Sequence, residues 1–177
     1  MMTTANMTES ELIDACLEGD RLAQKELYDR YSRAMYTAAY RIASDFDLAN
    51  DILQEAFVKV FRHLSGFRRE STLGAWIKTI VVRTALSRIR KEVKMESLED
   101  HHQRDQIIDW GHYLDADYLE KAIQALPTGY RSVFVMIEVE GYSHKEVADM
   151  LDISVGTSKS QLFYAKKKLR QSLEKYR

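Results

Sequence analysis

Cysteine, proline and glycine are scarce in this sequence, and their scarcity excludes several kinds of protein. The chain has 177 residues, among them one cysteine, one proline and seven glycines. A single cysteine, Cys16, allows neither an internal disulfide nor a cysteine-based zinc cluster. Folds built from strands and turns use many prolines and glycines, so this composition predicts an all-α fold.

Long apolar segments are missing as well. No run approaches the ~20 apolar residues that a membrane-spanning helix needs. The N-terminus has neither the basic region nor the apolar region of a signal peptide. We therefore expect a cytoplasmic protein that does not insert directly into a membrane.

Charges of the two signs are nearly balanced overall, but they are segregated along the chain. The formal net charge is −1. Residues 59–91 carry nine basic and one acidic side chain, and residues 127–177 carry nine basic and six acidic ones. Residues 1–58 and 92–126 are both acidic. Two separated basic zones predict two contacts with an anionic partner, of which DNA is the commonest.

Apolar residues recur at helical spacing through most of the chain. Thr8, with Glu11 three residues later, predicts a capping box at the start of the first helix. The pattern predicts helices over residues 9–17, 22–43, 48–64, 73–93, 115–126, 128–140, 144–151 and 155–170. Residues 93–115 are acidic and lack regular apolar spacing, so we expect a flexible linker there, with a short helical piece around 107–110.

The C-terminal part has the pattern of a helix-turn-helix. Ser143, with Glu146 three residues on, predicts an N-cap, and Asp152-Ile153-Ser154 predicts the tight turn. The second helix begins with polar residues of the types that reach base edges and phosphates in a major groove. The alternative is a plain helix pair with a solvated basic face. We favour DNA binding because the cap, the turn and the polar helix start occur in register.

The N-terminal part contains two further motifs. Asp51, Gln54, Glu55 and Val58 form a polar ridge on one helix, which is also compatible with an ordinary amphipathic surface. The following segment, FRRESTLGAWIKTIVVRTALSRIRK, mixes basic and aromatic residues, as proteins that bind melted or single-stranded DNA do. Its aromatic residues are equally compatible with a role in the core.

Together these motifs resemble a known family. DILQEAFVKVF, FRRESTLGAWIKTIVVRTAL and LPTGYRSVFVMIEVEGYSHKEVADMLDISVGTSKSQLFYAKKKL resemble the core-binding, promoter-melting and helix-turn-helix segments of group 4 sigma factors. This is the extracytoplasmic-function (ECF) class of the bacterial sigma-70 family. The resemblance implies a sigma2-like helical domain over residues 8–92, an acidic linker over 93–115 and a sigma4-like domain over 116–177.

The resemblance also implies a function and its residues. The protein would bind core RNA polymerase, recognise the −10 and −35 promoter elements and promote DNA melting. The implied polymerase-binding residues are Asp51, Gln54, Glu55 and Val58. The implied −10 DNA contacts are Phe67, Arg68, Arg69, Trp76, Lys78, Arg83, Arg88 and Arg90. The implied −35 DNA contacts are Arg131, Ser143, His144, Lys145, Thr157, Ser158, Lys159, Ser160, Gln161, Tyr164, Lys167 and Lys168. The sequence departs from the usual family residues at Arg83, Ser158, Gln161 and Tyr164.

Core RNA polymerase, promoter DNA and an anti-sigma factor, commonly a membrane-anchored one, are the partners that the resemblance implies. It implies no cofactor, no metal and no small-molecule substrate.

Two other classes of protein are compatible with parts of this sequence. One is a stand-alone helix-turn-helix regulator with a helical sensor or dimerisation domain. Such a domain does not need the basic zone at 59–91, which argues against this class. The other is an enzyme with a metal held by His101, His102 and His112, but adjacent histidines do not readily converge on one ion. No phosphate-binding loop, dinucleotide fingerprint or H-E-x-x-H motif is present, so we expect a protein that is not an enzyme. Cys16 has apolar neighbours and is predicted to be a packed residue rather than a redox sensor.

Overall fold

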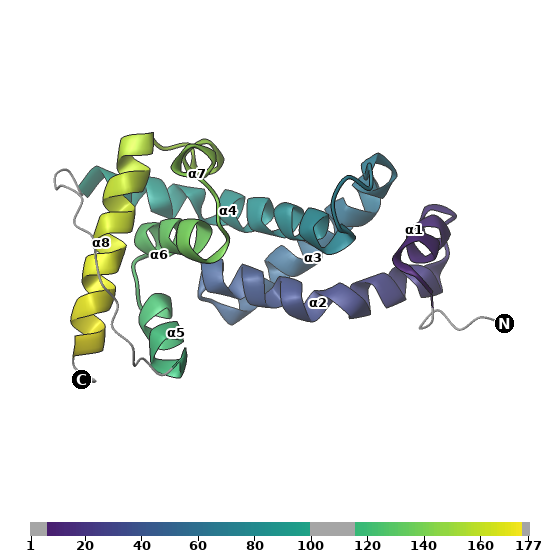
Figure 1. Cartoon of the computed structure of the whole chain (residues 1–177), viewed down its shortest axis with the longest axis horizontal. Helices are drawn as coiled ribbons and strands as arrows, with labels where there is room; N and C mark the ends of the chain where they lie inside the picture. Colours follow the sequence, from purple (N-terminus) through teal and green to yellow (C-terminus); the bar gives the residue numbers. More distant parts are fainter. Residues whose placement is uncertain (1–6, 100–115, 175–177) are drawn as a thin grey trace. The chain divides into compact units, whose positions relative to one another are not determined.

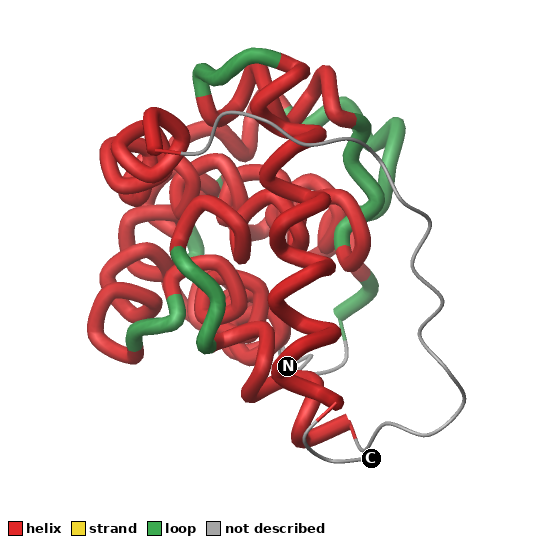
Figure 2. The backbone as a smooth tube through the Cα atoms, turned by 90° about the vertical axis from the view of Figure 1, so that its left-hand side faces the viewer, coloured by secondary structure: helices red, strands yellow, loops and turns green. Residues whose placement is uncertain are grey.

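The computed structural model describes residues 7–99 and 116–174, and within these ranges it contains helices and connecting turns but no strand (Figure 2). The all-α prediction is therefore confirmed. The chain divides into two compact units between Ala85 and Leu86. The expected helical piece at 107–110 and most of the expected linker lie outside the described residues.

The first unit contains four helical segments and the start of a fifth, coloured purple to teal in Figure 1. They are α1 (Glu9–Leu17), α2 (Arg21–Ala43), α3 (Phe46–His63), the 3-10 turn η2 (Leu64–Gly66) and the first part of α4 (Leu73–Glu99).

Local caps determine where these helices start. The predicted capping box at α1 is confirmed: the Glu11 amide donates to Thr8 Oγ1, and the Thr8 amide donates to the Glu11 carboxylate at 2.8 Å. Asp20 accepts the Leu22 amide at the start of α2. Asp45 accepts the Leu48 amide at the start of α3. Each cap satisfies amides that the first turn of a helix leaves without a partner.

Small residues let α2 and α3 pack closely. Ala39 on α2 and Ala49 and Ala56 on α3 are fully buried, and the two helices are in contact. Ile42 and Ile52 fill the space between them and are also fully buried. This packing holds the outer face of α3 rigidly toward solvent.

The second unit contains α5 (Ala116–Gln124), α6 (Thr128–Phe134), the π-helical turn η3 (Val135–Val139), α7 (His144–Leu151) and α8 (Val155–Leu173), coloured green to yellow in Figure 1. α8 packs against α5, α6 and α7. The expected single helix over 128–140 is instead an α-helical piece followed by a π-helical one.

The predicted helix-turn-helix is present in the second unit. Ser143 and Glu146 form the predicted capping box at the start of α7. Asp152 ends α7 in the left-handed conformation, with φ 55°. Ser154 then accepts the Thr157 amide at 2.9 Å and starts α8. The turn is therefore built from local polar contacts within a few residues.

α4 is longer than the sequence analysis predicted. It was expected to end at residue 93, and it extends to Glu99. Residues 94–99 (KMESLE) contain no proline or glycine, and all but the serine are good helix formers. The first part of the expected linker, 93–99, is therefore helical.

Cys16 is packed inside the first unit, as predicted, with 6% of its surface exposed. Burial, helped by the nearby Asp20 carboxylate, raises the pKa of its thiol to about 11. The thiolate is the reactive form of cysteine.

This burial predicts slow alkylation of the folded chain. At pH 7.5 iodoacetamide should modify Cys16 about 100-fold more slowly in the native protein than in urea, because a shift of about two pKa units lowers the thiolate fraction by that factor. Mass spectrometry over a time course measures both rates. Equal rates would show that Cys16 is accessible in the folded state.

Candidate functional site

The outer face of α3 carries most of the predicted docking residues. Asp51, Gln54 and Val58 are all exposed, and at spacings of three and four residues they share one side of the helix. Val58 is an apolar side chain with 57% of its surface exposed. We call these three residues the α3 ridge. Single exposed apolar residues are common on protein surfaces, so the α3 ridge is a docking candidate because it contains the residues that the family resemblance implies.

Glu55 lies beside the α3 ridge and has a second role. Its carboxylate forms an ion pair with Lys59 at 2.8 Å. Lys59 Nζ also donates to Thr84 Oγ1 on α4, at 3.2 Å. Sequence reasoning missed Lys59, although a Glu–Lys pair four residues apart on a helix is a recognisable signal. The pair connects α3 to α4 directly behind the ridge.

The loop between η2 and α4, residues 67–72, contains three of the residues predicted to contact the −10 element, and we call it the −10 loop. The rings of Phe67 and Trp76 lie 5.2 Å apart, and both side chains are half-buried. Arg68 is exposed. Arg69 adopts φ 58°, which is rare for a residue with a side chain. Its guanidinium contacts Ser10 and Asp14 on α1.

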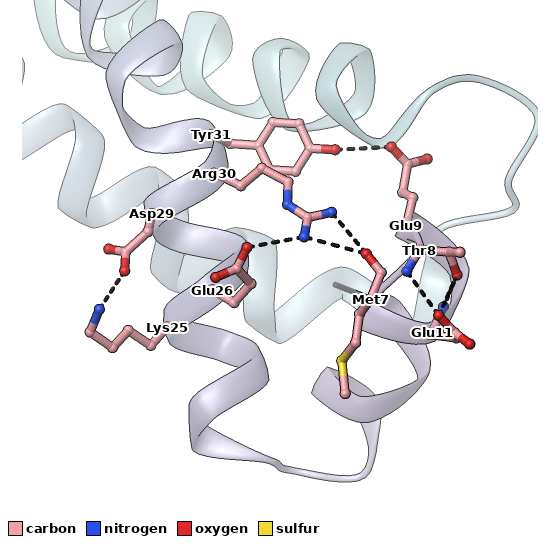
Figure 3. Close-up of polar contacts among 9 residues, drawn as sticks. All are labelled: Met7, Thr8, Glu9, Glu11, Lys25, Glu26, Asp29, Arg30 and Tyr31. Carbon is pink, nitrogen blue, oxygen red and sulfur yellow. Dashed lines mark hydrogen bonds and ion pairs between the residues drawn. The ribbon is translucent and has the colours of Figure 1, made fainter. Parts of the chain in front are cut away.

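Sequence reasoning also missed the part played by α1. Glu9 Oε1 accepts the Leu73 amide at 3.3 Å, and its other oxygen accepts the Tyr31 hydroxyl at 2.9 Å. Figure 3 shows the Glu9–Tyr31 bond and, beside it, Arg30 reaching Glu26 and the Met7 carbonyl. Burial and the hydrogen bond to Glu9 raise the pKa of Tyr31 to about 12.

Gly74 allows this close approach at the start of α4. A Cβ at this position would lie 3.1 Å from the Tyr31 ring. Any larger residue would therefore push α2 and α4 apart or displace the ring.

The predicted cations of α4 do not form one row. Arg83, Arg88 and Arg90 are exposed and Lys78 is half-buried. At ~100° per residue, Arg83 and Arg90 share one side of the helix with Trp76. Lys78 and Arg88 lie on other sides. A strand that runs along α4 can therefore meet Trp76, Arg83 and Arg90 in sequence.

The exposed face of α8 is narrower than the sequence analysis predicted. Lys159, Lys167 and Lys168 are exposed, and Thr157, Ser160 and Tyr164 are half-buried. Thr157 and Ser160 are partly engaged in local hydrogen bonds at the helix start. Tyr164 stacks on Tyr130 of α6 with ring centroids 5.9 Å apart, and the Lys168 ammonium lies over the same Tyr130 ring.

Phe163 was missed by sequence reasoning. It is half-exposed on the outer side of α8, next to Lys159 and Ser160, and its ring contacts Tyr164 edge-on. The sequence analysis gave this residue no role, although its position four residues after Lys159 places both on the same side of the helix.

Three predicted DNA contacts are buried, and the structure corrects them. Ser158 is fully buried and bonds His144 at 2.9 Å, while Gln161 is 1% exposed. Both lie on the side of α8 that carries Leu162, Ala165 and Leu169. Arg131 is 6% exposed and donates to the Leu126 carbonyl at 2.7 Å, where it caps the end of the preceding helical segment. These side chains cannot meet DNA without leaving the core.

The burial of Gln161 gives a direct test. Gln161→Met keeps roughly the volume of the side chain but removes a buried amide, so we expect the free energy of unfolding to fall by about 1 to 3 kcal/mol. DNA affinity should stay within twofold. Thermal unfolding and fluorescence anisotropy with promoter duplex measure the two quantities. A loss of affinity of tenfold or more with unchanged stability would restore Gln161 to the DNA-reading set.

The start of α7 carries the remaining predicted phosphate contacts. Lys145 is exposed. Ser143 is occupied by its capping box with Glu146, whose pKa is lowered by the hydrogen bonds from Ser143. His144 faces Ser158. Among Ser143, His144 and Lys145, it is Lys145 that presents an exposed positive charge for a phosphate contact.

Over the described residues no cluster of histidine, cysteine or carboxylate side chains could hold a metal ion. His101, His102 and His112 lie outside those residues. Within the same ranges, no helix is long and apolar enough to cross a membrane.

Two protein-family models match this chain, one in its N-terminal part and one in its C-terminal part. Residues 27–95 match Sigma-70 region 2, and residues 116–169 match Sigma-70, region 4. The ECF RNA polymerase sigma factor SigM of Mycobacterium tuberculosis is 30% identical over 169 residues, which cover 94% of this chain and 85% of that protein. The chain belongs to the ECF class of RNA polymerase sigma factors.

Other relatives place the same family across the whole chain. This sigma factor is 27% identical over 183 residues to the ECF RNA polymerase sigma-E factor of Haemophilus influenzae, covering 95% of this chain and 96% of the relative. The sigma factor RpoE of Bartonella quintana, solved with the anti-sigma factor NepR, is 25% identical with a TM-score of 0.53. That match covers 86% of this chain and 98% of RpoE. The stand-alone regulator is not favoured.

Proposed function

We propose that this sigma factor docks on core RNA polymerase through the α3 ridge, with Glu55 at its edge. The observation that supports the proposal is the match of residues 27–95 to Sigma-70 region 2, because this range includes the exposed α3 ridge, on which Val58 has 57% of its surface exposed. Burying such a side chain in a partner contributes about 1 to 2 kcal/mol. The acidic and amide groups beside it supply orientation and specificity.

The loop 67–72 and α4 bind the −10 element as melted single strand. Phe67 and Trp76 supply aromatic surface, and Arg68, Arg83 and Arg90 supply positive charge. Extracting a base from the duplex costs a few kcal/mol, which stacking and phosphate contacts offset. Lys78 and Arg88 contribute to the general positive potential of this helix.

The outer face of α8 reads the −35 element as duplex. Lys159 and Ser160 lie near the start of the helix, where a recognition helix meets base edges. Thr157 and Tyr164 border this face. Lys145 at the start of α7, together with Lys167 and Lys168 on α8, contacts backbone phosphates.

The partners and place of action follow from the family. The Bartonella quintana relative was solved with an anti-sigma factor, which supports a protein inhibitor for this chain too. We expect it to act in the cytoplasm as a binding subunit, with no catalytic step of its own.

Transcription with purified components tests the proposal. The chain is combined with bacterial core polymerase and a pool of templates with randomised −35 and −10 positions, and the transcripts are sequenced. We expect start sites that depend on the added chain and share two sequence elements, and loss of these transcripts with Asp51→Arg/Glu55→Arg. Promoter-specific DNA binding without any polymerase complex would overturn the proposal.

A further inference from the structure

Helix α1 contacts both ends of the loop 67–72. Arg69 Nη1 donates to Ser10 Oγ at 2.6 Å, and Arg69 Nη2 pairs with the Asp14 carboxylate at 2.5 Å. At the far end of the loop, the Leu73 amide donates to Glu9 at 3.3 Å. Three residues of one short helix, at positions 9, 10 and 14, therefore hold a loop that lies more than fifty residues further along the chain.

The anchoring residue Glu9 is itself held in place. Its second carboxylate oxygen accepts the Tyr31 hydroxyl from α2 at 2.9 Å, as Figure 3 shows. Arg30, next to Tyr31, reaches the Met7 carbonyl just before α1. α1 is thus fastened to α2 on one side and to the loop on the other.

The two neighbouring arginines of the loop differ in their surroundings. Arg69 sits in the left-handed conformation, which turns its side chain toward α1, and its charge faces the Asp14 carboxylate. Arg68 is exposed and makes no hydrogen bond or ion pair with the other described residues. Of these two arginines, Arg68 is the one whose positive charge is not balanced by a carboxylate of the described residues.

We propose that α1 is a positioning element for the −10 loop, and that Arg69 acts through Asp14 and Ser10 rather than by contacting DNA. This inference rests on the proposed function of the loop, and it reassigns Arg69 within it. Arg69 fixes the loop backbone, and that backbone presents Arg68 and the Phe67 ring to the melted strand.

The two possible roles of Arg69 predict opposite effects for Asp14. If Arg69 bound phosphate, removing Asp14 would release its guanidinium and delete a negative charge near DNA, so promoter melting would speed up. If Arg69 positions the loop, removing Asp14 loosens it, and melting slows although the protein becomes less acidic.

The experiment follows base unstacking in the complete holoenzyme. The chain is bound to core polymerase and mixed with a promoter carrying 2-aminopurine in the non-template strand of the −10 element, and the fluorescence rise gives the melting rate. We expect Asp14→Ala and Arg69→Ala each to slow melting about fivefold, and the double variant to be no slower than either, since they remove one interaction. The exchanged pair, Asp14→Arg with Arg69→Asp, should recover at least half of the wild-type rate.

Two matched controls separate positioning from general charge effects. Glu18→Ala removes an exposed carboxylate from the end of α1 and should leave the rate unchanged. Arg68→Ala should slow melting and also reduce the slope of log rate against log salt by about 1, as loss of a phosphate contact does. Arg69→Ala should leave that slope unchanged.

Several results would overturn the inference. One is promoter melting with Asp14→Ala that is as fast as or faster than with wild type. A second is an exchanged pair that melts the promoter as slowly as the single variants do. A third is a reduced salt slope for Arg69→Ala. The thermal midpoints of the single variants should stay within about 3 °C of wild type, because the pair is half-exposed. If wild type forms no promoter-specific complex, the proposed function fails. If wild type melts the promoter and the α1 variants match it, only the positioning role fails.

Discussion

Replacing Asp51 and Val58 with arginine is expected to weaken binding of core RNA polymerase about 100-fold or more. The change places two cations on the α3 ridge and removes its exposed apolar side chain. Both residues point into solvent, so the fold of the first unit should be unaffected. Fluorescence anisotropy of the labelled chain, titrated with purified core polymerase, gives the dissociation constants.

A matched control uses another exposed apolar residue of the same unit. Leu22 on α2 is 67% exposed, and Leu22→Arg introduces the same kind of change outside the α3 ridge. We expect it to bind core polymerase within twofold of wild type. Equal losses for Leu22→Arg and Val58→Arg would show that the ridge has no special role.

Reversing the charge of Lys159 is expected to reduce the affinity for −35 duplex about 30-fold. Lys159 is exposed on the outer face of α8, within the first turns of the helix. A glutamate there removes an attractive contact and adds repulsion from the phosphates. Anisotropy with labelled duplex at several salt concentrations measures the affinity and its salt dependence.

Lys121→Glu provides the control for this experiment. Lys121 lies on α5 in the same unit, is exposed, and sits over the Tyr118 ring. Lys121→Glu changes the net charge by the same amount as Lys159→Glu, so an effect of overall charge would appear in both variants. We expect Lys121→Glu to change the affinity less than threefold, and equal losses would argue against a reading role for Lys159.

The features that the sequence predicted correctly are those encoded over a few neighbouring residues. Thr8 with Glu11, and Ser143 with Glu146, form capping boxes because the four residues of each box contain every group involved. The apolar spacing likewise located the helices, since burial follows the 3.6-residue repeat. The end of α4 was missed because a pattern of charged helix formers resembles a linker in composition.

Misassigned residues of α8 show a different failure. Ser158 and Gln161 are polar, and polarity was taken as a sign of exposure. Ser158 lies four residues before Leu162, and Gln161 lies four residues before Ala165, so both are on the buried side of the helix. The helical repeat placed both residues on the buried side, whereas their polar residue type suggested exposure, and the prediction followed residue type.

The contact between α1 and the −10 loop could not be predicted from sequence. Arg69 and Asp14 are fifty-five residues apart, and nothing in either local pattern identifies the other. The left-handed backbone of Arg69 is equally invisible, because arginine rarely adopts it. Only the packed arrangement of α1, α2 and the loop brings these groups together.

The division of the chain between Ala85 and Leu86 also bears on the order in which the protein matures during synthesis. The α3 ridge, the −10 loop, helices α1 to α3 and the first part of α4 all precede that point. On the ribosome this first unit can be complete before α7 and α8 have been translated, because helical units with local contacts fold fast compared with chain elongation. A nascent chain can thus form its proposed polymerase-docking surface before its proposed recognition helix has been translated.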